Sequence, residues 1–198
     1  MSDRDVVITG VGMVTPLGLD RATTWAALHT RHSAVRTVTR FDPTPFRSHV
    51  AAAIEGFDPV VQLGQKLARR TDRCSQLALV ATGEALADAG LDPAALAPDR
   101  VGVMMGTALG GIGFAESENR KYVEGGLRAV DPLLALTVFG GALSCNIAIE
   151  HGMSGVNATN AMSCASGTIA IGEGFRAIRD GRADVMLVGG SEAPLYPL

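Results

Sequence analysis

A cysteine in a run of small residues is the feature of the sequence best suited to chemistry. The segment runs from Asn160 to Gly167, and Ala165 and Ser166 follow Cys164 within it. A predicted strand leads into the segment and a predicted helix leaves it, which places Cys164 at the first helical turn. Free N–H groups and the positive end of the helix dipole there favour thiolate over thiol. The small neighbours let a substrate reach the sulfur, and the same N–H groups are expected to stabilise an oxyanion.

The alternative for Cys164 is a buried structural cysteine in a small-residue packing site, and its spacing alone does not separate the two. Cys74 and Cys145 lie inside predicted helices, so both are expected to belong to the core. No two cysteines have the C-x-x-C spacing of a zinc site. The histidines have no partner at metal-ligand spacing and are expected to be structural or at the surface; they are His29, His32, His49 and His151. No metal is predicted.

Two glycine-rich turns follow predicted strands and raise the question of a nucleotide cofactor. Gly10-Val-Gly12 lacks the third glycine of the dinucleotide fingerprint because Thr15 occupies that position, so a tight strand exit is favoured. The turn at 106–113 lacks the Gly-Lys that ends a phosphate-binding P-loop. The segment 189–193 stops one residue short of a hydrolase nucleophile elbow, which favours a polar residue at a strand end. No cofactor is predicted.

Basic side chains gather in one stretch of an otherwise acidic chain. These side chains are Lys66, Arg69, Arg70 and Arg73. Such a run is commonly a solvated helix face. The functional alternative is a docking patch for an acidic partner.

The composition limits the class of protein. The chain has 198 residues, a net charge of −3, and 47% hydrophobic but 5% aromatic residues. This content predicts a core of small and aliphatic side chains and excludes a disordered chain. The slight acidity argues against nucleic acid as a partner, and no stretch reaches the roughly 18 apolar residues of a membrane helix. With no signal peptide and an odd number of cysteines, we expect a cytoplasmic protein.

Alternating strands and helices must position these residues. Short apolar runs predict strands at 6–9, 101–105 and 183–188, and residues 156–162 are expected to form a further strand. Helical spacing predicts helices at 23–29, 72–89, 133–149 and 168–179. In the last helix, the side chains expected to face a core are Ile169, Ile171, Phe175 and Ile178. The pattern implies an α/β fold with a parallel sheet covered on both faces.

With these motifs in order, the chain resembles the N-terminal part of a β-ketoacyl-acyl carrier protein synthase, of the ketoacyl synthase II or aromatic polyketide kind. The matching motifs span residues 6–198: VVITGVGMVTPLG, RFDPTPFRSHVAAAIEGFDP, RRTDRCSQLAL, GVMMGTALGG, SCASG and ADVMLVGGSEAPLYPL. The resemblance implies a thiolase-like fold, in which two similar α/β halves form a five-layered α-β-α-β-α core. Residues 1–198 are then expected to form most of the N-terminal half of a homodimer or close heterodimer.

By this resemblance, Cys164 takes the position of the acyl-accepting cysteine. Its thiolate is expected to accept an acyl chain from an acyl carrier protein. Malonyl-carrier protein then loses carbon dioxide, and the resulting enolate condenses with the acyl group. The two histidines and the lysine that family enzymes use for this second step come from the C-terminal half. We therefore expect the 198 residues alone to be inactive, as a fragment or as a chain that a second polypeptide completes.

The resemblance also implies roles for other positions. Leu109 matches the residue that gates the acyl pocket, and Leu134 matches a position that reaches toward the other subunit's pocket. Met162 lies two residues before the nucleophile. A plain core role is the alternative for all three residues. The charges that match the carrier-protein docking positions are Lys66, Arg69, Arg70 and Arg128.

Two departures from the family leave acyl chain length and partner preference open. The segment 134–141 lacks the Pro and Asn that family members commonly carry, and Val156 replaces the Pro that usually follows Gly155. Two other functions also stay open. One is a non-catalytic, chain-length-factor-like subunit of a ketosynthase heterodimer, although such partners usually carry another residue at the position of Cys164. The other is a thiolase-type enzyme acting on coenzyme A esters.

Overall fold

The computed structural model describes residues 4–197 and has a parallel three-stranded sheet at its centre. The strand order is β4 (Asn157–Asn160), β3 (Val101–Gly106), β5 (Val185–Gly190). Residue Val103 of β3 pairs with the first residue of β4 and with Leu187 of β5. The central strand is almost wholly buried, as expected of a parallel strand covered on both faces. Three of the four predicted strands are therefore confirmed.

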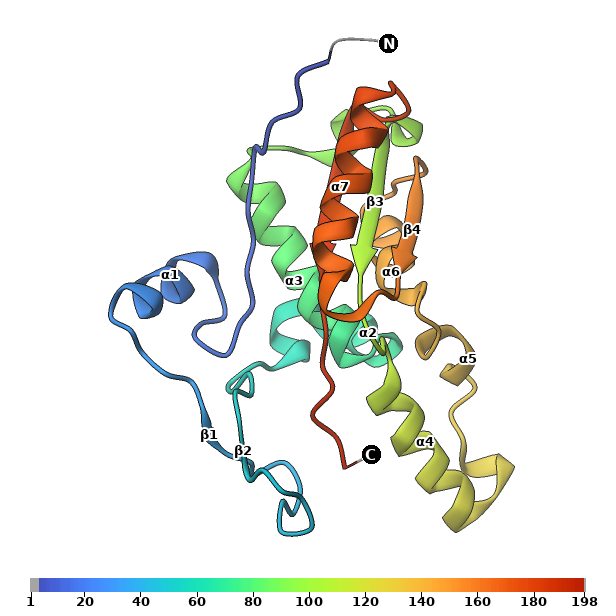
Figure 1. The fold of residues 1–198 in the computed structure, drawn as a ribbon. Coiled ribbons are helices and arrows are strands. Elements are labelled where there is room, and N and C mark those ends of the chain that lie inside the picture. Colours follow the sequence, from blue (N-terminus) through green and yellow to red (C-terminus); the bar gives the residue numbers. More distant parts are fainter. Residues whose placement is uncertain (1–3, 198) are drawn as a thin grey trace.

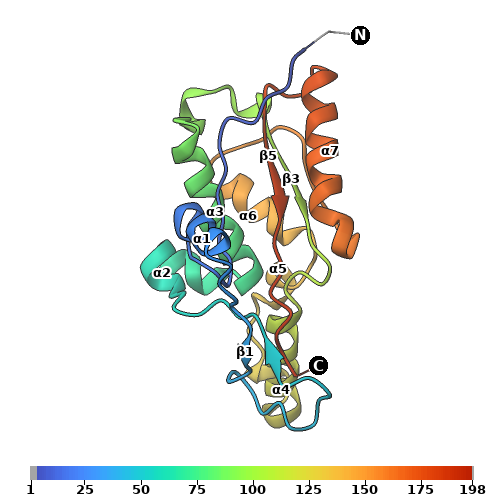
Figure 2. The ribbon, with the colours of Figure 1, turned by 60° about the vertical axis from the view of Figure 1, so that its left-hand side comes forward.

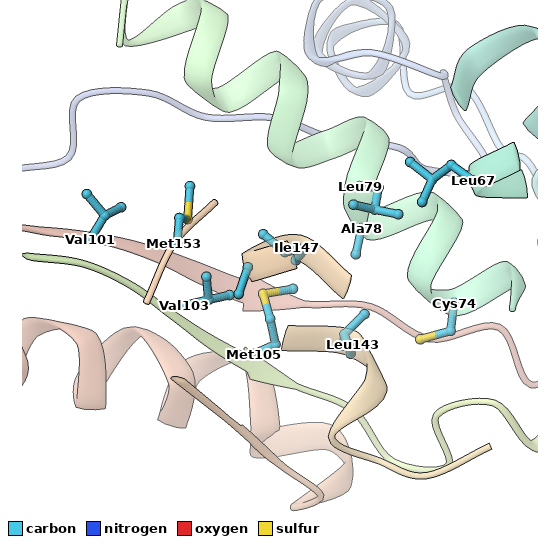
Figure 3. Close-up of a cluster of buried hydrophobic side chains, with 11 residues drawn as sticks. Leu67, Cys74, Ala78, Leu79, Val101, Val103, Met105, Leu143, Ile147 and Met153 are labelled. Carbon is cyan, nitrogen blue, oxygen red and sulfur yellow. The ribbon is translucent and has the colours of Figure 1, made fainter. Parts of the chain in front are cut away.

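Helices cover both faces of this sheet (Figures 1 and 2). Helix α7 (Ser166–Arg179) packs on one face, and α3 (Arg73–Asp88) and α6 (Ala142–Glu150) pack on the other. The core lies between β3, α3 and α6, as Figure 3 shows; it consists of Leu67, Cys74, Ala78, Leu79, Val101, Val103, Met105, Leu143, Ile147, Ala148 and Met153. The predicted three-layer α/β arrangement is confirmed.

The other elements surround these layers. The helices are α1 (Arg21–His29), α2 (Pro59–Arg70), α4 (Ile112–Gly125) and α5 (Leu134–Thr137). The antiparallel pair is β1 (Arg36–Thr37) and β2 (Val50–Ala51). The 3-10 turns are η1 (Pro93–Ala95), η2 (Pro98–Arg100), η3 (Leu127–Ala129) and η4 (Ser163–Ala165). In Figure 1, α1 and the β1–β2 pair project to the left of the sheet layers.

The prediction of a buried strand at 6–9 is wrong. This segment forms no ladder, and Val7 and Ile8 are 73% and 83% exposed. The chain then runs against α3 instead, where a Cβ on Gly10 would lie 2.1 Å from the Ala85 carbonyl oxygen. Gly12 is equally close to α3, since its Cβ would lie 1.8 Å from a helix carbonyl oxygen. The two glycines therefore allow backbone contact with a helix rather than a cofactor turn.

The predicted helix 133–149 is two helices, α5 and α6, separated by a break that includes Gly140 and Gly141. Glycine disfavours a helix interior because it loses the most backbone freedom on folding. The loop after β3 packs closely against the end of α5. Gly111 of this loop permits the contact, because a Cβ there would lie 2.4 Å from the Thr137 carbonyl oxygen. The predicted strand 156–162 likewise ends early, at Asn160, and the chain turns there into η4.

The side chains predicted to face a core in the last helix do not contact the sheet. Ile169, Ile171 and Phe175 are 38%, 51% and 42% exposed, and Ile178 is half-buried. The face of α7 that contacts the sheet carries small residues instead: Ser166, Ala170, Gly174 and Ala177. A Cβ on Gly174 would lie 2.3 Å from a methyl group of Val188 in β5, so larger side chains do not fit against the sheet. The large apolar side chains of α7 consequently point away from it.

An ion-pair cluster fixes the start of β5. Arg100 and Arg4 both donate to the Asp184 carboxylate, at 2.8 Å for their closest contacts. These hydrogen bonds, from Arg100 first and Arg4 second, lower the pKa of Asp184 to about 2. The cluster ties the N-terminal segment to the sheet although the two are far apart in the sequence.

Candidate active site at the carboxyl end of the sheet

The three parallel strands end at one edge of the sheet, and the site is built there. Gly106, Asn160 and Gly190 are the last residues of β3, β4 and β5 and are paired in register. After β4 the chain turns through η4, which contains Cys164, directly into α7. Ligands of open α/β sheets commonly bind beyond the carboxyl ends of the strands. The structure therefore confirms the predicted strand–cysteine–helix order and places Cys164 at this edge.

Glycines bring the first turn of α7 against the strand ends. A Cβ on Gly106 would lie 2.3 Å from the carbonyl carbon of Ser166. A Cβ on Gly190 would lie 3.2 Å from the Cα of Gly167. Neither strand can carry a side chain at these positions without displacing the helix start. The glycines that end β3 and β5 thus fix how close the cysteine turn lies to the sheet.

The turn that carries Cys164 has an unusual backbone. Ser163 has a φ of +51°, in the left-handed region that non-glycine residues rarely adopt. The N–H of Ala165 donates to the Met162 carbonyl oxygen at 3.3 Å, and the N–H of Ser166 donates to the Ser163 carbonyl oxygen. Cys164 itself is exposed. A solvent-accessible thiol on a constrained turn is suited to nucleophilic attack.

Part of the oxyanion site expected from the sequence is not available in the structure. The N–H groups of Ala165 and Ser166 are used within the turn, so they are not free for a substrate. Within residues 4–197, the N–H of Cys164 donates to no protein acceptor. This donor lies on the same residue as the sulfur, which suits it to a carbonyl oxygen under attack.

The side chain of Asn160 holds this turn. Its Nδ2 donates to the Ser166 carbonyl oxygen at 3.0 Å and to the Met105 carbonyl oxygen at 3.3 Å. Its Oδ1 accepts from the N–H of Met162 at 3.3 Å. Sequence reasoning assigned Asn160 no role. Its position offered a signal, because an amide side chain ends the strand immediately before the cysteine turn.

Glu192 holds the glycine-rich loop after β3. Its Oε2 accepts from the hydroxyl of Thr107 at 3.0 Å, from the N–H of Ala108, and from the N–H of Leu109 at 3.1 Å. A carboxylate of the chain itself therefore accepts from the hydroxyl and backbone donors of this loop. Glu192 is thus a structural anchor of this loop. Ser191, the serine of the incomplete elbow motif, instead donates its hydroxyl to the Cys74 carbonyl oxygen at 2.8 Å.

The loop after β3 and the cysteine turn are neighbours. The N–H of Thr107 donates to the carbonyl oxygen of Asn160 at 3.0 Å. The side chains of Leu109 and Met162, on the two segments, are 56% and 64% exposed. Neither side chain belongs to the core that residues 4–197 form. Both offer apolar surface at the edge of the sheet that carries Cys164.

The α5 segment adds further apolar surface. It adjoins the loop after β3, since a Cβ on Gly110 would lie 3.5 Å from the Cα of Gly140. Leu134, the residue singled out from the sequence, is half-buried. Leu136 of α5 and Phe139, two residues after its end, are 65% and 45% exposed, so they present more apolar surface than Leu134 does.

The four basic residues predicted to dock the carrier protein differ in their exposure and in their ion pairing. Lys66 and Arg69 on α2 and Arg128 on η3 are exposed. Arg70 is half-buried and forms an ion pair with Glu150 at 3.3 Å. Its charge is thus shared within the chain, although a partly exposed pair of this kind contributes little to stability.

Arg73 does not belong to the exposed basic group. Its guanidinium donates to the Ile54 carbonyl oxygen at 2.9 Å and lies 5.3 Å from the centre of the Phe57 ring. Burial lowers its pKa, and the nearby charge of Arg40 acts in the same direction. The sequence stretch therefore divides into an exposed pair on α2 and residues engaged within the fold.

The other candidate groups fall into structural roles or lie apart from Cys164. Cys74 is buried, as predicted, and its thiol donates to the Ser191 carbonyl oxygen at 3.1 Å. Burial raises the pKa of Cys74 to about 12, and the charge of Asp72 adds to the shift. Cys145 is half-buried rather than a core residue. Within residues 4–197 no histidine is hydrogen-bonded to Cys164, and no cluster of His, Cys, Asp and Glu could hold a metal ion.

Each helix in the described part of the chain is too short or too polar to cross a membrane.

Comparison with known proteins agrees with this geometry. The family model described as "Beta-ketoacyl synthase, N-terminal domain" matches residues 3–198. The chain is 41% identical over 204 residues to the tetracenomycin polyketide synthase ketoacyl synthase alpha subunit of Streptomyces glaucescens, covering 100% of this chain and 48% of that protein. It is 35% identical over 193 residues to 3-oxoacyl-[acyl-carrier-protein] synthase 2 of Staphylococcus aureus strain COL, covering 98% of this chain and 47% of that protein. The chain thus spans about half the length of these curated relatives.

Solved structures show the same fold. The ishigamide ketosynthase/chain length factor aligns with a TM-score of 0.84 and 31% identity, over 93% of this chain and 46% of that one. AntDE:AntF, a type II PKS acyl-carrier protein in complex with its ketosynthase bound to the hexaketide, aligns with a TM-score of 0.82 and 29% identity, over 96% of this chain and 51% of that one. The fold class predicted from the sequence, α/β and thiolase-like, is confirmed.

Proposed function

Because the chain belongs to the β-ketoacyl synthase family, we propose that it provides the acyl-accepting nucleophile of a β-ketoacyl-acyl carrier protein synthase of fatty acid or polyketide biosynthesis. One observation carries the proposal. Cys164, at the position of the family's acyl-accepting cysteine, is exposed on a constrained turn where three parallel strands end and α7 begins.

The first half-reaction uses groups of this chain. The thiolate of Cys164 attacks the carbonyl carbon of an acyl thioester, and a carbon–sulfur bond forms while the carbonyl oxygen becomes an oxyanion. The free N–H of Cys164 stabilises the charge that develops on that oxygen. Collapse of the tetrahedral intermediate breaks the bond to the carrier's sulfur, which leaves as a thiolate and takes a proton from solvent. The acyl chain is then held on Cys164 as a thioester.

The acyl chain needs apolar surface next to the sulfur. Leu109 and Met162 provide exposed apolar side chains at the same edge of the sheet, and the chain just after α5 adjoins the loop that carries Leu109. We assign Leu109 the gating role that the resemblance implies, and Met162 a contact with the acyl chain. Leu134 keeps its proposed position toward the pocket of the other subunit, with Leu136 as a more exposed neighbour.

The second half-reaction needs groups from outside residues 1–198. Malonyl-carrier protein loses carbon dioxide, and the enolate carbon attacks the acyl-enzyme carbonyl, which releases Cys164 and lengthens the chain by two carbons. The four histidines of this chain form no hydrogen bond to Cys164 within residues 4–197. We therefore expect that residues 1–198 on their own do not decarboxylate malonyl thioester. Steady release of carbon dioxide by these residues alone would contradict this.

Two kinds of protein partner fit the surface. An acyl carrier protein is the proposed donor, docked by Lys66, Arg69 and Arg128, with Arg70 less available because Glu150 shares its charge. A second ketosynthase subunit, identical or related, is the other. Within residues 4–197, β4 has one edge without a strand partner, and unpaired edges favour pairing with another chain. The outward apolar side chains of α7 likewise suit the further layer of a five-layered core.

Docking can be tested by charge reversal. Lys66→Glu and Arg69→Glu should raise the carrier-protein concentration needed for half-maximal acylation about tenfold, because each reverses an attractive charge. Arg47→Glu is the matched control, since Arg47 is equally exposed but lies on the β1–β2 connection. Equal effects of all three substitutions would show that only net charge matters and would contradict a specific docking surface.

The choice of acyl donor separates the proposed function from its alternatives. The full-length protein is incubated with one acyl group on an acyl carrier protein or on free coenzyme A, and adduct formation is followed by mass spectrometry. Faster acylation from the carrier protein supports the ketosynthase. Acylation from coenzyme A with no benefit from the carrier would indicate thiolase chemistry. No adduct from either donor would indicate a non-catalytic, chain-length-factor-like subunit.

A further inference from the structure

The side chain of Asn160 connects three backbone segments around the nucleophile. Its amide reaches the end of β3 at the Met105 carbonyl oxygen, the first turn of α7 at the Ser166 carbonyl oxygen, and the N–H of Met162. The contacts at Met162 and Ser166 flank Cys164 by two residues on each side. We refer to the three hydrogen bonds together as the Asn160 clamp.

The chemistry of the neighbours fixes the orientation of this amide. Two of them are carbonyl oxygens, which only accept, and the third is an N–H, which only donates. The amide must therefore present its NH2 to Met105 and Ser166 and its oxygen to Met162. The backbone of Asn160 is also fixed, because its carbonyl oxygen accepts from the N–H of Thr107 at 3.0 Å.

The clamp encloses the strained residue of the turn. Ser163 has its left-handed φ of +51° between Met162 and Ser166, which are the two clamped positions nearest Cys164. A non-glycine residue keeps such a backbone only when the surrounding contacts hold it. We propose that Asn160 is a positioning residue that maintains the Ser163 conformation and so aims the Cys164 thiol for acyl transfer. This inference rests on the proposed function, because it takes Cys164 as the nucleophile.

Two substitutions separate the bonds of the clamp. Asn160→Ala removes all three hydrogen bonds. Asn160→Asp keeps an acceptor for the N–H of Met162 but turns a carboxylate oxygen toward the carbonyl oxygens of Met105 and Ser166. Like partial charges then face each other, so the Asp variant should be impaired at least as strongly as the Ala variant. The matched control is Asn157→Ala, an exposed asparagine at the opposite end of β4.

The experiment has two readouts on the full-length protein. Hydrogen exchange should increase in a peptide spanning residues 160–168 of both Asn160 variants, but not in a peptide from α3. Single-turnover acyl transfer from an acyl carrier protein should fall by about tenfold or more, because misplacing a reacting group is costly. The half-saturating carrier concentration should stay unchanged, since the clamp does not touch the basic residues of α2. Asn157→Ala should match the wild type in both measurements.

The outcomes distinguish this inference from the proposed function. Wild-type exchange at 160–168, or wild-type acyl transfer, in Asn160→Ala would overturn the clamp. Increased exchange throughout the sheet would also overturn it, since that indicates a general loss of stability. If the wild-type protein forms no adduct at Cys164 while exchange changes only at 160–168, the proposed function fails, and the structural part of the clamp is supported.

Discussion

Replacing Gly106 with Ala would drive the new methyl group into the first turn of α7. The added Cβ would lie 2.3 Å from the carbonyl carbon of Ser166, 2.4 Å from its oxygen and 2.7 Å from the nitrogen of Gly167. These are backbone atoms, so no side-chain rotation relieves the contact. Ordinary contact starts near 3.4 Å, and the helix start must therefore move by about 1 Å.

This displacement has two expected consequences. Overpacking of a well-packed site typically costs about 1–3 kcal/mol, so the free energy of unfolding of Gly106→Ala should fall by about that amount. A shift of about 1 Å at a reacting group can cost about a hundredfold in rate, so acylation of Cys164 should slow by one to two orders of magnitude. Urea unfolding followed by circular dichroism measures the first effect. Single-turnover acylation followed by mass spectrometry measures the second.

Gly83→Ala is the control, because Gly83 lies within α3 and an added Cβ meets no atom within 4 Å. Relative to alanine, glycine in a helix interior costs about 0.5–1 kcal/mol, so this variant should be slightly more stable and react normally. Wild-type stability and wild-type acylation in Gly106→Ala would refute the conclusion that a glycine contact sets the position of the cysteine turn.

Three further predictions test other parts of the structure. Glu192→Ala should lower the free energy of unfolding in urea by at least about 2 kcal/mol, since a single hydrogen bond to a charged group typically contributes about 1.5–3 kcal/mol and Glu192 accepts three. Glu192→Gln should recover part of the loss, and equal stability of all three proteins would refute the anchor role. Iodoacetamide at pH 8 should alkylate Cys164 but not Cys74 in the native protein, because burial raises the pKa of Cys74 to about 12; peptide mapping that finds Cys74 modified without denaturant would contradict this. The pKa of Asp184 is lowered to about 2, so its stabilising effect is present above the unfolded value of about 4 and is lost as pH falls between these values. Asp184→Asn should therefore remove stability at pH 5 but little at pH 2, as thermal unfolding at the two pH values would show.

The sequence was sufficient to predict the elements that carry the nucleophile. The short strand-like segment 156–162 before Cys164 and the helical spacing after it predict the strand–turn–helix order, because both patterns are local. The predicted helix at 72–89 corresponds to α3, which starts after its N-cap Asp72. The central strand at 101–105 was equally recognisable, since a short apolar run ending in glycine is typical of a buried parallel strand.

The remaining features depend on contacts that a local pattern does not contain. The apolar run at 6–9 has strand-like composition, but within residues 4–197 it pairs with no strand. In α7 both faces carry apolar residues, and only the closeness of Val188 to Gly174 decides that the small residues face the sheet. The clamp of Asn160 also joins residues that are 55 positions apart, so spacing within the motif could not reveal it.

The most direct test of the proposed function locates the acyl group. The full-length protein is incubated with an acyl-acyl carrier protein, digested, and analysed by tandem mass spectrometry, alongside Cys164→Ala and Cys145→Ala. We predict one acyl thioester on Cys164, its loss in Cys164→Ala, and its retention in Cys145→Ala, whose half-buried thiol lies within α6. An acyl group on another residue, or an unchanged adduct in Cys164→Ala, would contradict the assignment of Cys164 as the nucleophile.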